Sequence, residues 1–206
     1  MNVFYIQGLE TFRQEEIEGP EFASRFAESL RFSTFSYFRE IQSHEQAHVD
    51  QLSQVITDLG GTPVEACTYD FGYETVDEFA AVAQALENTG VSAYNGAINL
   101  LENDELLTAA ATIATVEGRH ASYLNLVNGE VPFPNAFDPA RSMQEVLDIA
   151  GQFIVECPGQ GTTQAGTGTE TGTTTGTGTT TGTGTMTGTG TSMGTSTADH
   201  TTTDGY

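Results

Sequence analysis

Residues 103–127, NDELLTAAATIATVEGRHASYLNLV, carry the pattern that decides the fold. Apolar side chains recur every three or four positions along this stretch, including Leu106, Ile113 and Leu124. This periodicity predicts one amphipathic helix over the whole stretch. Asn103 is a suitable N-cap, and two acidic residues follow it, where the N-terminus of a helix favours negative charge.

Two more stretches have the same period and extend the pattern to a bundle. One runs from about Leu30 to Leu59, the other from about Val76 to Leu101, and a shorter segment from Asn2 to about Phe12 resembles the end of a fourth helix. One or two residues separate the second and third long helices, which must therefore be antiparallel neighbours. About 16 residues lie between the first two, enough for a crossover. We therefore expect an all-α, four-helix bundle over residues 1–130, with a helical turn near Glu21–Glu28.

The composition divides the chain near residue 160. Residues 161–206 contain 22 Thr and 12 Gly, and such a segment buries too little apolar surface to offset its conformational entropy. We expect a disordered tail there and one domain over residues 1–160. The last part of that domain, after Val131, is expected to wrap irregularly around the bundle, with a short helix over Ser142–Phe153.

The charge of the chain excludes one class of partner. Of 206 residues, 28 are acidic and only 6 are basic, all of them Arg, which gives a formal charge of −22. A surface this negative repels phosphate backbones, so we expect no nucleic-acid partner. The apolar runs fall short of the roughly 20 residues that span a bilayer, so we expect no membrane anchor.

Each long helix carries a carboxylate on its apolar face. Glu45 and His48 share one face by i, i+3 spacing, Glu117 and His120 repeat that arrangement, and Glu87 stands alone on the middle helix. Burying these five ionisable groups without compensation would cost many kcal/mol. A bound cation removes that cost, so the pattern predicts a metal site.

The level of these residues along the bundle supports one shared site. Glu87 lies 16 residues before Asn103, whereas Glu117 and His120 lie 14 and 17 residues after it. In an antiparallel hairpin, residues equally far from the connecting turn lie at the same depth. We therefore expect these three side chains to meet in one cavity.

Two E-x-x-H helices combined with single glutamates resemble the ligand arrangement of ferritin-like di-iron or di-manganese carboxylate proteins. The strings IQSHEQAHVDQL (41–52), ALENTGVSAYNGA (85–97) and VEGRHASYLN (116–125) resemble the ferritin-like branch of plant desiccation-related proteins and secreted fungal stress-response proteins. The resemblance covers about residues 1–158. It implies iron or manganese as the cofactor and oxygen or peroxide chemistry, although the branch also includes stress proteins without turnover. The implied metal ligands are Glu45, His48, Glu87, Glu117 and His120.

The resemblance also bears on the cysteines and the first helix. From the residues alone, Cys67 and Cys157 could equally form a disulfide or remain free thiols. The resemblance favours the disulfide and an extracellular or cell-wall location, with the signal peptide missing from this chain; the sequence itself leaves a cytoplasmic location open. FYIQGL (4–9) matches the end of the family's first helix, whose glutamate would lie at or before Met1. The chain would then begin inside that helix and lack one ligand, so the site could stay without metal. A homodimer could cover the apolar surface that the missing half of the helix leaves exposed.

Two alternatives stay open at this point. His44 to His48 reads HExxH, the zinc-binding motif of metallopeptidases. No third zinc ligand follows at a convincing spacing, and this interpretation leaves Glu87, Glu117 and His120 unexplained. The second alternative is a non-enzymatic stress or structural module with a degenerate site. In the ferritin-like interpretation, His44 lies beside the ligands and faces outward.

Overall fold

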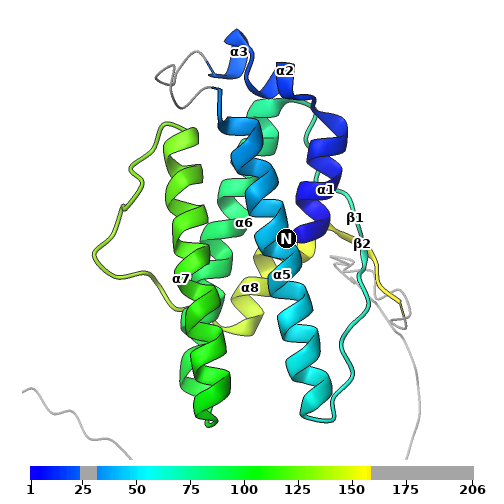
Figure 1. Ribbon diagram of the computed structural model, residues 1–206, viewed down its shortest axis with the longest axis vertical. Helices are drawn as coiled ribbons and strands as arrows, with labels where there is room; N and C mark the ends of the chain where they lie inside the picture. The colour runs from blue at the N-terminus through cyan, green and yellow to red at the C-terminus, as the bar shows by residue number, and fades with distance from the viewer. Residues whose placement is uncertain (24–31, 159–206) are drawn as a thin grey trace, which may run out of the picture. The chain divides into compact units, whose positions relative to one another are not determined.

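Three long helices and one shorter helix form the bundle. The computed structural model describes residues 1–23 and 32–158. The long helices are α5 (Thr34–Asp58), α6 (Val76–Ala97) and α7 (Asp104–Val127), and the short helix α1 (Asn2–Thr11) packs against α5 (Figure 1). The predicted all-α bundle is therefore confirmed, and the helix boundaries fall within a few residues of those expected from the periodicity.

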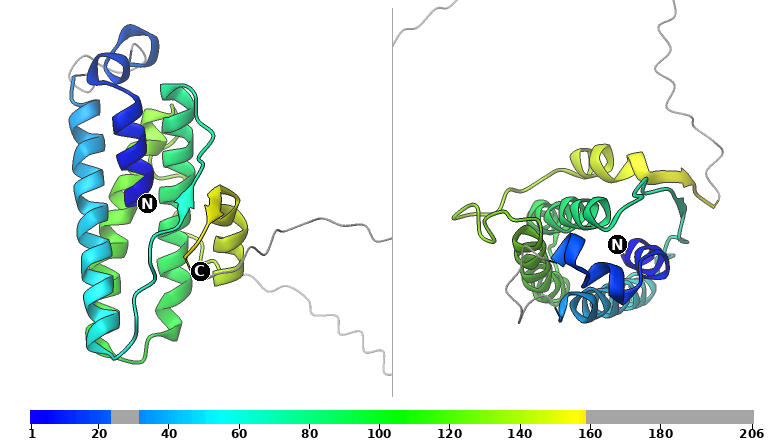
Figure 2. Two further views of the ribbon diagram at one scale, coloured as in Figure 1. Left: turned by 90° about the vertical axis from the view of Figure 1, so that its right-hand side faces the viewer. Right: turned by 90° about the horizontal axis from the view of Figure 1, so that it is seen from above.

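Shorter elements close the ends and one side of the bundle. They are α2 (Gln14–Ile17), α3 (Pro20–Ala23), η1 (Ile98–Leu100), α8 (Met143–Ala150), η2 (Gly151–Phe153) and the strands β1 (Thr68–Tyr69) and β2 (Ile154–Glu156). The final short helix was predicted, and Figure 2 shows it on the outside of α6. The expected turn near Glu21–Glu28 is seen only as α3, because its remainder lies outside the described residues, as does the Thr/Gly tail from residue 161.

Local side-chain chemistry explains where α6 and α7 begin. The Asn103 side chain accepts hydrogen bonds from the backbone N–H groups of Glu105 and Leu106, at 2.8 and 3.1 Å. It caps α7, as the sequence predicts. At the start of α6, Thr75 and Glu78 form a capping box. Both helices therefore have defined starting points, which fixes their register across the hairpin.

A disulfide joins the crossover to the C-terminal wrap. Cys67 and Cys157 are bonded, so the pairing implied by the family resemblance is confirmed. Beside it, β1 and β2 pair antiparallel, with Thr68 opposite Glu156. Neither strand was expected, because two or three residues carry no detectable alternating pattern. A cross-link between residues 90 positions apart restricts the unfolded chain and so stabilises the fold.

Aromatic side chains fill the part of the core beside α1. Phe4 stacks on Phe79 with ring centroids 5.0 Å apart, and Tyr5 and Phe38 pack against the same ring. A Cβ atom on Gly8 would overlap the Phe79 ring. Glycine at this position therefore lets α1 approach α6 closely. Among the described residues, none of the helices combines the length and apolar character required to cross a membrane.

We predict opposite effects for two helix glycines. Gly8→Ala should destabilise the protein by about 1–3 kcal/mol, because the added methyl group overpacks the aromatic core. Gly118→Ala is the matched control. Apart from its chain neighbours and the backbone of its own helix, no described atom lies within 4 Å of the added Cβ, and alanine's helix propensity should stabilise by up to about 1 kcal/mol. Urea unfolding measures both, and equal effects would contradict this packing.

Candidate metal centre

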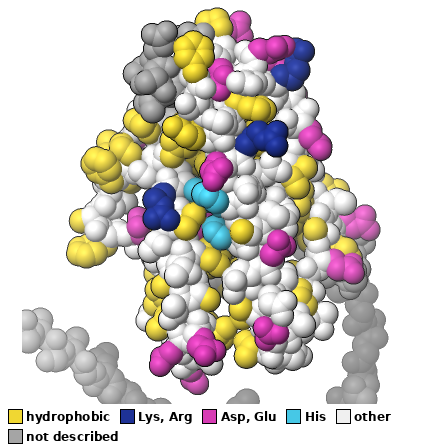
Figure 3. Space-filling model, in the orientation of Figure 1, with side chains coloured by type: hydrophobic (Ala, Val, Ile, Leu, Met, Phe, Trp, Pro, Cys, Tyr) yellow, Lys and Arg dark blue, Asp and Glu magenta, His cyan; other side chains and the backbone are white. Residues whose placement is uncertain are grey.

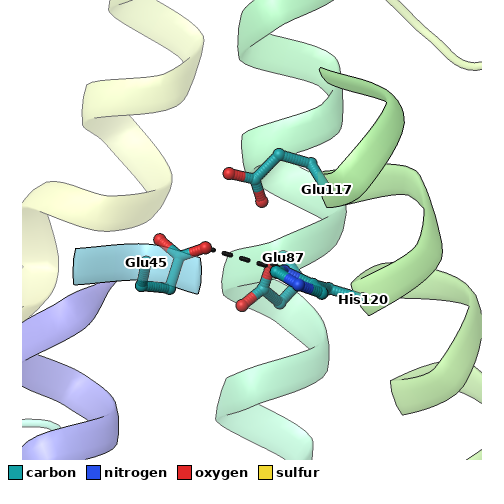
Figure 4. A group of neighbouring side chains, drawn as sticks. All are labelled: Glu45, Glu87, Glu117 and His120. Carbon is teal, nitrogen blue, oxygen red and sulfur yellow. Dashed lines mark ion pairs between the residues drawn. The ribbon is translucent and has the colours of Figure 1, made fainter. Parts of the chain in front are cut away.

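Three helices bring four of the five expected ligands together. Glu45 extends from α5, Glu87 from α6, and Glu117 and His120 from α7, and Figure 4 shows these side chains directed toward one another. Each offers one ligand atom, and these four atoms lie within 4.8 Å of one another. All four residues are at most 5% exposed. The level of the residues along the bundle thus predicted the meeting of Glu87, Glu117 and His120 correctly.

The fifth residue, His48, lies at the edge of the same cluster. Its Nδ1 atom is 3.1 Å from Oε1 of Glu117 and 3.3 Å from Oε1 of Glu45. On the other side, Nδ1 of His120 lies 3.6 Å from Glu45 and 3.4 Å from Glu87. Glu45 therefore lies between two imidazole nitrogens that come from different helices.

Every one of these five residues has a buried polar atom that lacks a hydrogen-bond partner among the described residues. The N···O approaches among these residues, at 3.1–3.6 Å, are ion-pair contacts. The atoms are Oε1 of Glu45, Nδ1 of His48, Oε2 of Glu87, Oε2 of Glu117 and Nδ1 of His120. An unsatisfied buried polar atom costs about 1–3 kcal/mol, so five in one place require an explanation. Carboxylate oxygens and imidazole nitrogens are metal ligands, and a cation among them would satisfy all five.

Tyr5 fixes the orientation of Glu87. Its hydroxyl group donates a 2.7 Å hydrogen bond to Oε1 of Glu87, and its side chain is fully buried. Burial and the charge of Glu87 raise the pKa of Tyr5 well above its usual value, so the hydroxyl keeps its proton. Sequence reasoning missed this residue. The available signal was the Tyr5 hydroxyl group within the apolar segment Phe4 to Ile6, but periodicity does not show which residue that hydroxyl group contacts.

His44 lies beside the ligands and is 42% exposed, as expected, but it also meets the ligand His120. Its Nδ1 atom lies 3.0 Å from Nε2 of His120, and its Nε2 atom lies 3.3 Å from Glu40. The α5 helix turns His44 toward α7, whereas His48 reaches the carboxylates of Glu45 and Glu117. The two histidines of the HExxH string thus meet different partners, an arrangement that does not favour a metallopeptidase zinc site.

The charges of the cluster are strongly shifted by burial. Burial, together with the negative charge of Glu87 and Glu45, raises the pKa of Glu117 to about 10. Burial alone would lower the pKa of His120, but the adjacent Glu45 and Glu87 outweigh it and raise that pKa to about 9. Without metal, the site at neutral pH therefore holds one proton on Glu117 and an imidazolium at His120.

The other two groups shift in the opposite direction. Burial would raise the pKa of Glu87, but contacts with His120, Glu117 and Tyr5 hold it below its usual value. Burial lowers the pKa of His48, which favours the neutral imidazole that binds metals. The cluster thus combines an ionised carboxylate with a neutral imidazole in a water-poor interior.

Gly90 leaves room next to this cluster. A Cβ atom at this position would lie 3.3 Å from Oε2 of Glu117 and 2.9 Å from the terminal methyl carbon of Met1. Any side chain at this point of α6 would press against a carboxylate oxygen that has no hydrogen-bond partner among the described residues. The glycine keeps the space beside Glu117 free.

Comparison with a known protein gives one distant relative. The chain is 23% identical over 153 residues to Protein rds1 of Schizosaccharomyces pombe, an alignment that covers 74% of this chain and 35% of that protein. The chain therefore spans about a third of the length of the curated relative it matches. A fungal relative agrees with the branch that the sequence resembles.

The family match covers the helices that build the site. The family model described as a ferritin-like domain matches residues 1–130, which includes α1, α5, α6 and α7. That range contains Glu45, Glu87, Glu117 and His120, and it ends where the irregular wrap begins. With this match over more than half of its length, on a four-helix core with a carboxylate and histidine cluster, the chain belongs to the ferritin-like domain family.

Proposed function

We propose that the cluster is a metal centre that holds iron or manganese. The observation that carries this proposal is the set of five unpartnered buried atoms on Glu45, His48, Glu87, Glu117 and His120. Mixed carboxylate and imidazole ligands suit these two metals. When bound, such a metal supplies redox chemistry with oxygen or peroxide, the activity that the family resemblance suggests.

The arrangement of the ligands suggests two metal positions of unequal strength. Glu45 and Glu117 flank Nδ1 of His48, while Glu45 and Glu87 flank Nδ1 of His120. Glu45 belongs to both sets and is placed to be shared. The three carboxylates supply three negative charges, so one divalent ion would leave a net charge of −1 and two would leave +1. We expect the second ion to bind more weakly than the first.

The protein residues around the cluster prepare it for this role. Tyr5 occupies one oxygen of Glu87 and leaves the other directed at the cluster. Burial of Glu87 and Glu117, at 0% and 1% exposure, keeps water away from the carboxylates and strengthens their attraction for a cation. The protons on Glu117 and His120 must leave when a metal binds, because the carboxylate oxygen of Glu117 and Nδ1 of His120 must each offer a lone pair to the metal.

The wider biological role proposed here is a stress- or desiccation-related protein outside the cell or in the cell wall. The Cys67–Cys157 disulfide supports such a location, because disulfides persist in oxidising compartments. The fungal relative supports the family branch in which such proteins occur.

A second candidate is a structural module without metal, and one observation favours it. Protons on Glu117 and His120 neutralise part of the cluster's charge, so the empty site carries its own compensation. In that case the residues that bind metal in the family would form a buried polar cluster here, and bound protons rather than a metal would offset its negative charge. Bound metal distinguishes the two candidates, because only the metal centre requires it.

Metal content should depend on the cluster. Protein purified without chelators should contain close to one or two equivalents of iron or manganese. The double variant Glu117→Ala/His120→Ala should lose most of it, because α7 would no longer supply any ligand. Glu105→Gln, an exposed position on the same helix, is the control and should keep the wild-type content. Elemental analysis measures all three proteins. Identical trace metal in the wild type and the double variant would refute the metal centre.

Stability of the metal-free protein should fall as the pH rises. The folded-state pKa values of Glu117, about 10, and His120, about 9, exceed their ordinary values of 4.5 and 6.5. Each group therefore favours the folded state below its ordinary pKa and loses that contribution as the pH approaches the raised value. Thermal unfolding of protein made metal-free with EDTA should show a decline that begins near pH 4.5, is steepest between about pH 6.5 and 9 and ends near pH 10. Fe²⁺ or Mn²⁺ added after the EDTA has been removed should reverse it.

The variant Glu117→Gln tests which residue causes this dependence. Its amide does not ionise, so its unfolding temperature should change less with pH than that of the wild type. Glu105→Gln should follow the wild type, because the residue is exposed. A slope in Glu117→Gln as steep as in the wild type would show that Glu117 is not protonated in the fold.

A further inference from the structure

A chain of close polar contacts leads from the buried cluster to the protein surface. Nδ1 of His120 faces Glu45 and Glu87, and its other ring nitrogen, Nε2, lies 3.0 Å from Nδ1 of His44. The far nitrogen of His44, Nε2, lies 3.3 Å from Oε1 of Glu40. This series of contacts ends at the protein surface, since the side chains of His44 and Glu40 are 42% and 70% exposed.

The two imidazole rings have the geometry of a directional hydrogen bond. Their planes differ by 9° and their centroids lie 5.2 Å apart. This separation exceeds the 3.0 Å nitrogen distance by about one ring diameter. The rings of His44 and His120 therefore meet edge to edge in nearly one plane, with the facing nitrogens between them. An in-plane N–H group of one ring then points at the in-plane lone pair of the other.

One assignment of protons satisfies the whole chain of contacts. If Nδ1 of His120 offers its lone pair to a metal, the neutral ring carries its proton on Nε2 and donates it to Nδ1 of His44. His44 must then carry its own proton on Nε2, where Glu40 accepts it. In the opposite pair of tautomers, the Nδ1–H group of His120 would face the metal, and Nε2 of His44 would turn a lone pair toward the Glu40 carboxylate.

The cleft beside this contact is lined largely by apolar side chains, together with Glu40 and Arg119. His44 and His120 line a surface cleft of about 420 Å³, whose walls include Tyr37, Ile41 and Tyr123. Figure 3 shows histidine and acidic side chains next to one another on this face of the molecule. Apolar walls limit competition from water, so the hydrogen bond between the rings keeps more of its strength.

We propose that His44, itself oriented by Glu40, is a positioning residue that fixes the ring and the tautomer of His120 so that Nδ1 of His120 faces the metal. This inference rests on the proposed metal centre and extends it to a residue outside the ligand set. Partners that orient a ligating histidine through its second nitrogen typically change metal affinity by roughly 10- to 100-fold when removed. His44, which the HExxH motif would make a zinc ligand, would instead orient a ligand.

Two substitutions separate hydrogen bonding from packing. His44→Leu keeps bulk but cannot accept a hydrogen bond, so Zn²⁺ affinity, measured by competition with a chelator, should fall by roughly 10- to 100-fold. His44→Gln can accept the N–H of His120 through its amide oxygen and should recover most of the affinity. Gln51→Leu, an exposed position on the same helix, controls for an added surface leucine and should leave affinity unchanged.

A spectroscopic measurement reads the tautomers directly. The chain has only four histidines, so ¹⁵N-labelled histidine gives a simple NMR spectrum. In the Zn²⁺-loaded wild type, His120 should show a metal-bound Nδ1 and a protonated Nε2, and His44 a protonated Nε2 with an accepting Nδ1. In His44→Leu, the Nε2 proton of His120 should exchange faster with water. The metal-free variant should unfold at a temperature close to that of the metal-free wild type, which would show that the fold is unchanged.

The outcomes distinguish this inference from the proposed function. If the wild type binds no Zn²⁺, both the metal centre and the role of His44 are overturned. If it binds Zn²⁺ as tightly as His44→Leu does, only the role of His44 fails. Equal losses in His44→Gln and His44→Leu would also overturn it, because packing rather than hydrogen bonding would then explain the effect.

Discussion

Burial of three carboxylates within one apolar bundle is the constraint on which the rest of this structure depends. Glu45, Glu87 and Glu117 are each at most 3% exposed, and an isolated buried carboxylate is strongly unfavourable. The surrounding groups all reduce this cost in different ways. Tyr5 donates a hydrogen bond to Glu87, a proton neutralises Glu117, and His120 carries positive charge while the site holds no metal. A cation would replace those protons with a stronger, shared interaction.

The architecture supports this constraint by holding three helices in a fixed relative position. The caps at Thr75 and Asn103 set where α6 and α7 begin, and the short turn between the helices keeps their facing residues level. Gly8 allows α1 to approach α6, which brings Tyr5 within reach of Glu87. The disulfide and the small sheet secure the crossover that connects α5 to α6. Rigid placement is what allows five donor atoms from separate segments to share one small volume.

The string from His44 to His48 shows how one motif can serve a different chemistry. On an isolated helix, HExxH places two histidines on one face, where they can bind a single zinc ion. In this bundle, Glu45 is buried in the centre, His48 lies at its edge, and His44 meets another histidine across the helix interface. The neighbouring helices, which supply Glu87, Glu117 and His120, decide which of these roles each residue takes.

The sequence by itself determined the helices, their order and the depth of the site. Apolar periodicity, the Asn103 cap and the short connection before α7 are local features, and i, i+3 spacing within a helix fixes which side chains share a face. These relations predicted the E-x-x-H pairs and their common level with Glu87. The disulfide followed only from the family resemblance, because two cysteines in loops carry no local sign of their pairing.

Only the tertiary structure decided how the helix faces meet. The contacts of Tyr5 with Glu87 and of His44 with His120 join residues 82 and 76 positions apart. Such contacts depend on the rotation of each helix about its axis, which is set by packing of the whole core rather than by local spacing. The pairing of β1 with β2 was likewise invisible, since their backbone hydrogen bonds require segments that the bundle and the disulfide bring together. The sequence therefore specified the ligand residues, whereas packing selected the groups that orient them.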